Sequence, residues 1–536
     1  MPPTPSLLRS MLSFSGGTFV SRVLGLVREM VIAWTFGANA TTDAFWVAFR
    51  IPNFMRRLFA EGSFAAAFVP VLTEVKERDS AEALRELIAR TAGTLGGILL
   101  VVTALGIACA EGVTRVFAPG SIDDPAKLAL TADLLRLTFP YLLFVSLTAL
   151  AGSVLNSFHR FALPALTPVI FNLCMIAGAL WLAPRMDVPI MALGWAILAA
   201  GVLQLLFQLP ALRRLNLLTL PRWGWRHPQV QRILKLMVPT LFGSSVAQVN
   251  LLLDTLIASF LITGSQTWLS QTDRLLEFPL GLFGVALGTV ILPSLSRHHV
   301  GDDPLGYSKA LDWGLRTALL IALPAMLGLV LLAGPIVSTL FQHGRFDAHD
   351  VRMASLSLSA LSFGLPAFVL VKVLAPAFYA RQDTRTPVRA GVAAMVASML
   401  LNVVFVGLLL ALWHAPGDLS DGWLAALERV PGLHVGLALA SALASYLNLA
   451  LLWRALRREG LYRRQPGWGR HLLRLGLACA ALVAVLVGGL VVWNDWTAWP
   501  AATRLLRLSI LIVAAGTAFV ATLLALGLRV RDLRAH

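Results

Sequence analysis

The chain has 536 residues, of which 57% are apolar and only 13% are charged, and its mean hydropathy is +0.75. Soluble proteins carry about 25% charged residues, so this composition excludes a soluble globular protein and indicates an integral membrane protein. The net charge of +16 would suggest nucleic-acid binding in a soluble chain. In a membrane protein, positive residues collect in cytoplasmic loops instead, so we expect no nucleic-acid partner.

Apolar runs of about 20 residues recur along the whole chain, which is typical of transmembrane helices rather than barrel strands. The sequence therefore predicts an all-α membrane protein with fourteen transmembrane helices. In chain order the predicted spans are residues 10–36, 41–72, 86–112, 129–157, 160–183, 187–210, 230–262, 266–296, 309–340, 351–380, 386–412, 433–457, 470–493 and 505–528.

The loops between these spans differ in charge. The basic segments lie on one side of the fourteen-helix count, and the short neutral or acidic loops lie on the other. The basic set comprises residues 74–78, 213–232, 381–385, 454–464 and 529–534. Because basic loops stay in the cytoplasm, this pattern predicts that both termini are cytoplasmic.

Two short matches indicate an internal repeat. "FVPVLTE" is echoed by "ILPSLSR", and Pro164 is echoed by Pro387, both at a separation of 223 residues. Six-helix units repeated in the same orientation are typical of transporters. The predicted organisation is an N-lobe at 1–215 with helices 1–6, a basic cytoplasmic linker at 216–229, a C-lobe at 230–458 with helices 7–12, and helices 13–14 at 459–536.

Four arginines lie within predicted spans, namely Arg22, Arg28, Arg56 and Arg274. Each would cost about 2.5–3.5 kcal/mol at a helix centre facing lipid, so we expect them to face water, a partner charge or a ligand. Gly25 leaves room beside the first two for a ligand or a neighbouring backbone. The carboxylates nearby are too few to neutralise all four, which favours an anion site, and arginine suits phosphate through its forked donors.

The second span contains Pro52, which removes a helical hydrogen bond and predicts a break in the helix. Asp43 and Glu61 flank this position and are candidate counter-charges. For Arg50 and Arg57, packing or snorkelling is the favoured interpretation, because either residue can lie near a helix end.

In the eighth span, Arg274 precedes Glu277 by three residues, and Asp273 precedes it by four. These spacings permit an ion pair on one helix face. Asp254 is a lone acid in the seventh span, where pairing with an arginine, carrying a coupling proton and binding a cation all remain open. Lys372 is similarly placed in the tenth span.

Five stretches of the chain are distinctive. They are "SRVLGLVRE", "TDAFWVAFRIPNFMRRLFAEGSFAAAFVPVL", "DRLLEFPLGLFGVALGTVILPSLS", "FQHGRF" and "VKVLAPAFYARQDTRTPV". They resemble the bacterial lipid II flippase family MurJ, also called MviN, of the multidrug/oligosaccharidyl-lipid/polysaccharide (MOP) exporter superfamily. The resemblance runs over essentially the whole chain. It implies two six-helix lobes plus two helices, a cationic central cavity, and a lateral groove from the last two helices for a polyprenyl tail.

The resemblance also implies a function and a set of site residues. The activity would be translocation of lipid II, an undecaprenyl-pyrophosphate-linked disaccharide peptide, from the cytoplasmic to the periplasmic leaflet by alternating access. The essential arginines would be Arg22, Arg28, Arg56 and Arg274, which bind the pyrophosphate and head group. Supporting residues in the cavity or gate would be Ser21, Asp43, Pro52, Asn53, Glu61, Asp273 and Glu277. From their places within the spans, Gly25 and Lys372 are expected to join this supporting set.

Some members of that family bind sodium, and Asp254 matches one ligand of the sodium site, while the predicted eleventh span offers few oxygens. Coupling to the membrane potential, to protons or to sodium therefore remains open. We expect no cofactor, no metal site and no catalysis, because no catalytic or metal-binding motif is present. The expected location is the bacterial inner membrane, with membrane lipids and a cell-wall synthesis or division complex as further partners.

Three other functions compete with this interpretation. One is a related exporter of another polyprenyl-linked oligosaccharide or of a cationic drug, although surplus arginine disfavours a cation. Another is a polytopic enzyme acting on polyprenyl phosphate, which needs a metal-binding or acid/base cluster. The last is a non-transporting scaffold of a cell-wall assembly complex.

Overall fold

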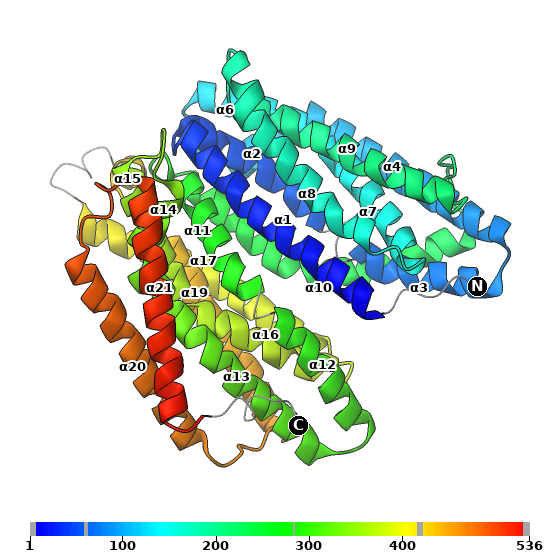
Figure 1. Cartoon of the computed structure of the whole chain (residues 1–536). Helices are drawn as coiled ribbons and strands as arrows, with labels where there is room; N and C mark the ends of the chain where they lie inside the picture. Colours follow the sequence, from blue (N-terminus) through cyan, green and yellow to red (C-terminus); the bar gives the residue numbers. More distant parts are fainter. Residues whose placement is uncertain (1–6, 58–62, 282–284, 415–421, 529–536) are drawn as a thin grey trace. The chain divides into compact units, whose positions relative to one another are not determined.

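A computed structural model describes residues 7–57, 63–281, 285–414 and 422–528, and these ranges contain helices and no strands (Figure 1). The chain divides into two compact units, residues 1–266 and 267–536. The predicted all-helical class is confirmed. The predicted lobe boundary near residue 229 stays a prediction.

The first unit holds the helices up to α10, and most of them are labelled in Figure 1. Their bounds are α1 Leu7–Phe36, α2 Ala40–Arg56, α3 Ser63–Arg78, α4 Ala81–Ala108, α5 Ala110–Phe117, η2 Pro119–Ser121, α6 Pro125–Thr138, α7 Tyr141–Ser157, α8 Ala162–Ala177, η3 Gly178–Leu182, η4 Ala183–Arg185, α9 Met191–Arg214 and α10 Pro228–Ala258.

The second unit begins within α11 and runs to the end of the chain. Its helices are α11 Ser265–Pro279, α12 Val285–Val300, α13 Pro304–Leu331, α14 Ala333–Phe341, α15 Ala348–Ser362, α16 Leu365–Tyr379, α17 Arg385–Trp413, α18 Trp423–Arg429, α19 His434–Arg458, α20 Trp468–Val492 and α21 Ala501–Ala525.

Ten helical segments within the described ranges are long and apolar enough to cross a membrane. All ten coincide with predicted spans. The predicted spans outside this set are residues 10–36, 41–72, 230–262 and 266–296. Where the structure describes them, these four are helical except at residues 259–262, and they carry the ionisable residues that lower their hydropathy. The total of fourteen spans therefore stays a prediction.

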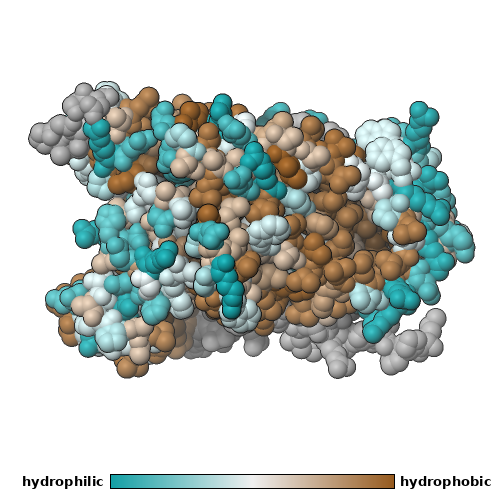
Figure 2. Space-filling view, turned by 90° about the horizontal axis from the view of Figure 1, so that it is seen from above, coloured by the Kyte–Doolittle hydropathy of each residue, from teal (hydrophilic) through white to brown (hydrophobic). Residues whose placement is uncertain are grey.

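Large apolar side chains are exposed along the outer helices. Examples are Leu412 on α17, Val491 on α20 and Val513 on α21, which are 67%, 73% and 66% exposed. Figure 2 shows brown, apolar atoms covering broad continuous areas of the visible face. Apolar surface on this scale is not tolerated in water and is what a bilayer covers. The chain is a multi-pass membrane protein.

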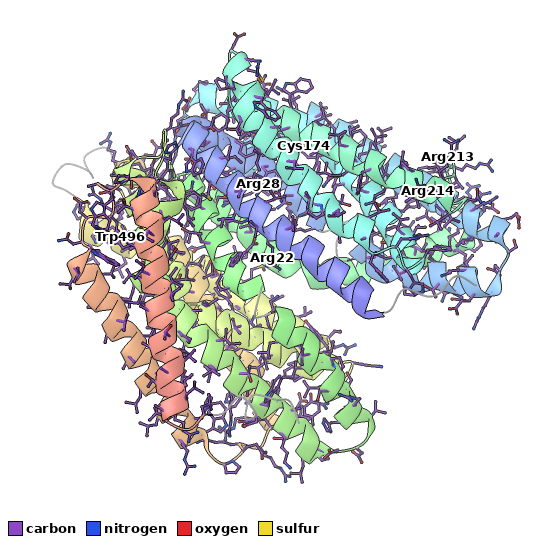
Figure 3. All side chains as sticks on the ribbon, in the orientation of Figure 1. Arg22, Arg28, Cys174, Arg213, Arg214 and Trp496 are labelled. Carbon is purple, nitrogen blue, oxygen red and sulfur yellow. The ribbon has the colours of Figure 1, made fainter. Side chains whose placement is uncertain are left out.

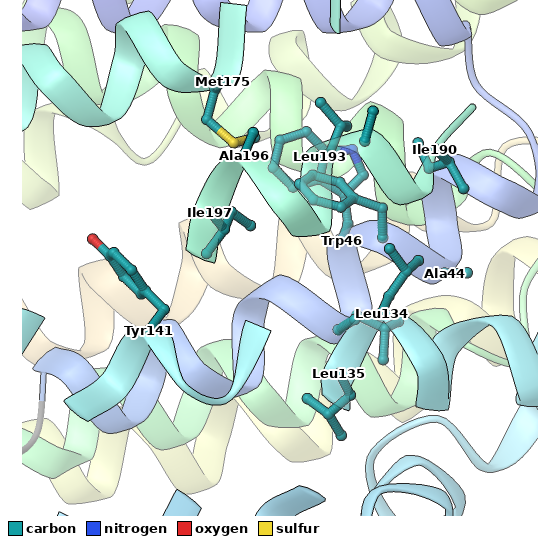
Figure 4. Close-up of a cluster of buried hydrophobic side chains, with 14 of the residues drawn as sticks. Ala44, Trp46, Leu134, Leu135, Tyr141, Met175, Ile190, Leu193, Ala196 and Ile197 are labelled. Atoms are coloured by element: carbon teal, nitrogen blue, oxygen red, sulfur yellow. The ribbon is translucent and has the colours of Figure 1, made fainter. Parts of the chain in front are cut away.

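The core of the first unit is built from close helix packing. Trp46 on α2, Leu134 on α6, Met175 on α8 and Leu193 on α9 are buried in one cluster (Figure 4). Asn39 fixes the start of α2 through a capping box with Thr42, which satisfies backbone donors at that helix end. This packing holds α2 and α8 in fixed positions within the unit.

One sequence prediction about α2 was wrong. The helix continues through Pro52 and ends at Arg56, so Pro52 does not break it. The missing donor of Pro52 removes one hydrogen bond, and Ile51, directly before it, still keeps helical geometry. Both residues are buried in the unit, and tertiary packing overrides the local preference.

The segment after α9 packs along α4. The backbone N–H of Arg222 donates to the carbonyl of Ala89 at 2.9 Å, and the N–H of Gly224 donates to the Thr94 hydroxyl at 3.0 Å. Gly93 permits this approach, since a Cβ there would lie 2.2 Å from the Arg222 carbonyl oxygen. The basic segment is therefore docked on the first unit.

Candidate functional site

The candidate site begins on α1, which carries both Arg22 and Arg28 (Figure 3). The backbone at Gly25, between them, is buried, and Arg28 is buried to 8% exposure. Arg22 is half-buried. The two guanidinium groups therefore lie on one helix in different environments.

Arg28 is held by three neighbours in the first unit. Its guanidinium forms an ion pair with Glu29 and donates a hydrogen bond to the side-chain oxygen of Asn172 at 3.1 Å. It also lies 5.3 Å from the ring centroid of Phe171, which is within the range of a cation–π interaction. A buried arginine needs such partners because desolvation of the charge is costly. Arg28 is therefore an anchored cation.

Asn172 on α8 connects this arginine to the preceding turns of α1. Its amide nitrogen donates to the carbonyl of Ser21 at 3.0 Å. Nearer the start of α8, the Thr167 carbonyl accepts a hydrogen bond from the side-chain amide of Gln204 on α9 at 2.9 Å. Asn172 thus fixes α1 against α8 with both ends of its amide group.

Arg22 differs from Arg28 in its partners. Among the residues that the structure describes, its side chain makes no hydrogen bond and no ion pair. A half-buried guanidinium in this condition retains all five donors for a ligand. The pair on α1 therefore consists of one anchored cation and one available cation.

The predicted residues of α2 contact α10 and the segment after it. Buried Asp43 accepts a hydrogen bond from the backbone N–H of Gly264 at 2.7 Å. Buried Arg50 donates to the Thr255 hydroxyl at 2.8 Å and to the Gln266 side-chain oxygen at 2.9 Å. The structural interpretation of Arg50 is confirmed, because these bonds fix α2 against α10.

The end of α2 places two more arginines in partly exposed positions. Arg56 donates from Nε to the side-chain oxygen of Asn53 at 3.0 Å, one turn earlier. Arg57 donates to the side-chain oxygen of Gln248 on α10 at 3.3 Å. Pro52 is buried one residue before Asn53. Glu61, the other predicted counter-charge, lies outside the described residues.

The second unit contains the remaining predicted residues. Arg274 on α11 forms an ion pair with Glu277 at 3.1 Å, so the prediction from their spacing is confirmed. Asp273 is half-buried beside them, and Lys372 on α16 is exposed. Because Arg274 belongs to the second unit, it is described with α11 and not with the arginines of α1 and α2.

Asp254 lies on α10 in the first unit. Its carboxylate accepts a hydrogen bond from the side-chain amide of Asn250 at 3.1 Å, one turn earlier. Within the described ranges no group of three or more His, Cys, Asp or Glu side chains is placed to hold a metal ion. The role of Asp254 in cation coupling stays a prediction.

Two residues of this site were missed by sequence reasoning. Glu29, directly after Arg28 in "VRE", supplies the counter-charge of that arginine, and Asn172 supplies its neutral acceptor. Glu29 could have been found from the sequence, because an acidic residue directly follows Arg28. No local signal marks Asn172, because it lies 144 residues away from Arg28 in the chain.

Comparison with known proteins gives a consistent result. The sequence profile of the family "Lipid II flippase MurJ" matches residues 32–505. The "Probable lipid II flippase MurJ" of Vibrio cholerae serotype O1 is 45% identical, over 99% of this chain and 98% of that protein. The "Lipid II flippase MurJ" of Burkholderia cenocepacia is 43% identical, over 92% of both chains.

Solved structures agree with the sequence relatives. "Lipid II flippase MurJ, inward closed conformation" superposes with a TM-score of 0.75 at 25% identity, over 95% of this chain and 99% of that one. An inward-facing multidrug resistance MATE family transporter of the MOP superfamily has a TM-score of 0.64 at 12% identity, over 84% of this chain and 98% of that one. The second likeness concerns the fold alone.

Proposed function

Because the chain belongs to the lipid II flippase MurJ family, we propose that it translocates lipid II from the cytoplasmic to the periplasmic leaflet of the inner membrane. The V. cholerae and B. cenocepacia relatives carry this activity in their names, and they align over nearly their full lengths. A flippase moves its substrate without forming or breaking covalent bonds, so the protein works as a transporter and not as an enzyme.

The observation that carries this proposal is the pair of arginines on α1. Lipid II joins its polar head to its polyprenyl tail through a pyrophosphate. The available guanidinium of Arg22 suits this group through its forked donors. Arg28 is held by Glu29, which balances its charge, and by Asn172, so its side chain is fixed beside the available Arg22.

The proposed transport cycle uses alternating access. Fourteen helices form two six-helix lobes, and the last two helices, α20 and α21, form a groove for the polyprenyl tail. Arg56 and Arg274 add positive charge to a central cavity in this proposal. The polar head crosses inside the protein while the tail stays in the bilayer, which avoids the cost of moving charges through lipid.

The membrane potential favours the proposed direction of transport. Moving one negative charge out of a negative interior is favourable by about 2.3 kcal/mol per 100 mV. Both termini are cytoplasmic in this proposal, as the basic loops require. Whether protons or sodium at Asp254 reset the empty carrier is a separate question, and membrane lipids and a cell-wall synthesis complex are the proposed partners.

The test is replacement of the resident flippase in a bacterial host. The host flippase is depleted, the chain is supplied in its place, and lipid II exposed on the outer face of the inner membrane is measured. Restored exposure supports the proposal. Failure of a well-expressed chain in the host, together with failure of the purified protein in liposomes containing lipid II, contradicts it and favours another polyprenyl-linked cargo.

A further inference from the structure

A basic cavity lies in the second unit where α13 meets the start of α20. It has a volume of about 220 Å³. Three arginines line it, Arg316 on α13 and Arg470 and Arg474 on α20, and no acidic residue does. We propose that this cavity binds the phosphate of an anionic phospholipid at the membrane interface.

The carboxylate that pairs with Arg316 is already occupied. Asp312 on α13 accepts hydrogen bonds from the Tyr462 hydroxyl and the Trp468 indole, each at 2.6 Å. Its other oxygen lies 2.7 Å from Nε of Arg316. Asp312 is therefore saturated by one arginine and two neutral donors, and it leaves the other arginines of the cavity without a counter-charge.

Arg316 itself is rigidly placed. Besides its ion pair with Asp312, it donates to the Pro466 carbonyl at 2.8 Å, and it lies 5.2 Å from the ring centroid of Trp468. These contacts hold its guanidinium at the wall of the cavity beside Gly467. A preorganised arginine loses little side-chain entropy when it binds an anion.

Arg470 and Arg474 have no such partners. Within the described part of the chain, neither side chain makes a hydrogen bond or an ion pair. Both lie in the first two turns of α20, which has no acidic residue in its first turn and no side-chain cap. Cations repel the positive end of a helix dipole, so this arrangement is unfavourable until an anion binds.

His471 adds an independent observation. It lines the same cavity, and its Nε2 atom is buried without any hydrogen-bond partner. A buried polar atom without a partner is costly, and a ligand oxygen in the cavity would satisfy it. The cavity therefore offers a buried polar ring nitrogen among its three arginines.

The surroundings favour a lipid as the source of the phosphate. Trp313, Leu320 and Leu528 form the apolar part of the lining. Next to the cavity, Leu473 and Leu477 on α20 are 64% and 47% exposed, which continues an apolar outer face. A phospholipid with its phosphate in the cavity would place its acyl chains along this apolar face. A soluble anion has no apolar part that could contact the face. Basic cavities between helices at the cytoplasmic interface commonly bind such head groups.

The test uses the full chain in phosphatidylcholine vesicles and compares the binding of spin-labelled phosphatidylglycerol with that of spin-labelled phosphatidylcholine. The double variant R470Q/R474Q removes two charges from the cavity. The matched control R463Q/R464Q removes two charges from exposed positions just before α20, outside the lining. We expect the cavity variant to lose selectivity for phosphatidylglycerol by about thirtyfold, since each of the two basic residues contributes about 1 kcal/mol. We expect the control to keep it.

The other outcomes overturn the proposal. An equal loss of phosphatidylglycerol selectivity in both variants would indicate diffuse attraction to basic loops. Unchanged selectivity in both would show that the cavity does not bind this lipid. If inorganic phosphate at constant ionic strength displaced phosphatidylglycerol, the ligand would be a soluble anion. The single variant Arg470→Gln repeats the binding test with less risk of misfolding, because Arg470 is exposed and its side chain makes no hydrogen bond or ion pair within the described part of the chain.

This inference does not depend on the proposed transport of lipid II, and one further measurement separates the two. In vesicles without anionic lipid, R470Q/R474Q should move lipid II at the wild-type rate. A lower rate there would place the cavity in the transport path and overturn its assignment to phospholipid. A wild-type protein that fails to move lipid II but binds phosphatidylglycerol selectively would contradict only the proposed transport.

Discussion

The side-chain oxygen of Asn172 lies 3.1 Å from the guanidinium of Arg28, and the amide nitrogen of the same residue donates to the carbonyl of Ser21 at 3.0 Å. One side chain on α8 thus fixes both the charge on α1 and the backbone two turns before it. The position of Arg22, one residue after Ser21, depends on the same contact.

The first prediction concerns Asn172→Ala. Each lost hydrogen bond costs about 1 kcal/mol, and the carbonyl of Ser21 and the guanidinium of Arg28 both lose a partner. We expect a lower midpoint of thermal unfolding in detergent and slower lipid II transport. Asn156→Ala, at an exposed position on α7, is the matched control and should change neither. Wild-type behaviour of Asn172→Ala would show that this contact does not position α1.

The second prediction concerns Glu29→Gln. The substitution leaves Arg28 buried without its counter-charge, and breaking a buried pair costs about 3–5 kcal/mol. We expect a large loss of folded protein, measured as the monodisperse fraction after heating in detergent. Glu111→Gln removes an exposed partner of Arg115, which should cost about 0–1 kcal/mol. Equal effects of the two substitutions would contradict the description of Arg28 as an anchored cation.

The third prediction concerns the segment docked on α4. A Cβ at Gly93 would lie 2.2 Å from backbone atoms of Arg222, whereas a Cβ at Gly96 would meet only Leu147, at 3.8 Å. Gly93→Ala should therefore displace the basic segment, and trypsin should cleave at Arg222 faster than in wild type. Gly96→Ala makes the same chemical change on the same helix and should leave the cleavage rate unchanged. Equal rates in all three proteins would show that the segment is not held by this contact.

The fourth prediction is a pH dependence. Burial and the hydrogen bond to Asp312 raise the pKa of Tyr462 above its ordinary value of 10.0. A raised folded-state pKa contributes stability that is present below about pH 10 and is lost as the pH rises further. We expect the thermal midpoint of the wild type to fall above about pH 10 by more than that of Tyr462→Phe, which cannot ionise. The hydroxyl of Tyr462 also bonds Asp312, so the variant should be less stable than wild type at neutral pH. Parallel pH curves above pH 10 would contradict this role of Tyr462.

Sequence patterns predicted the helices well. The last predicted span, 505–528, corresponds to α21 at Ala501–Ala525, because apolar length is a strong local signal. Pro52 misled the prediction for α2, because a local preference for a break was outweighed by burial. Helix ends are set partly by such packing and are therefore less readable than helix centres.

The sequence located the charged residues within helices but not most of their partners. The sequence indicated arginines inside spans, and the pairing of Arg274 with Glu277 followed from their spacing on one helix. The contact of Arg50 with Thr255 joins residues 205 positions apart in the chain. The spacing of residues within one helix gives no information about a contact between such distant segments. The neutral amide of Asn172 was missed for the same reason. Sequence reasoning thus found the charges, and the structure separates the anchored ones from the available one.

The central claim is that Arg22 supplies the available charge for the pyrophosphate of lipid II. The direct measurement is lipid II translocation in proteoliposomes by wild type, Arg22→Ala and the exposed control Arg160→Ala. We expect Arg22→Ala to fall about tenfold or more, since a charge-assisted hydrogen bond contributes about 1.5–3 kcal/mol, while its thermal midpoint and the activity of Arg160→Ala stay at wild-type values. Translocation by Arg22→Ala at the wild-type rate would contradict the claim.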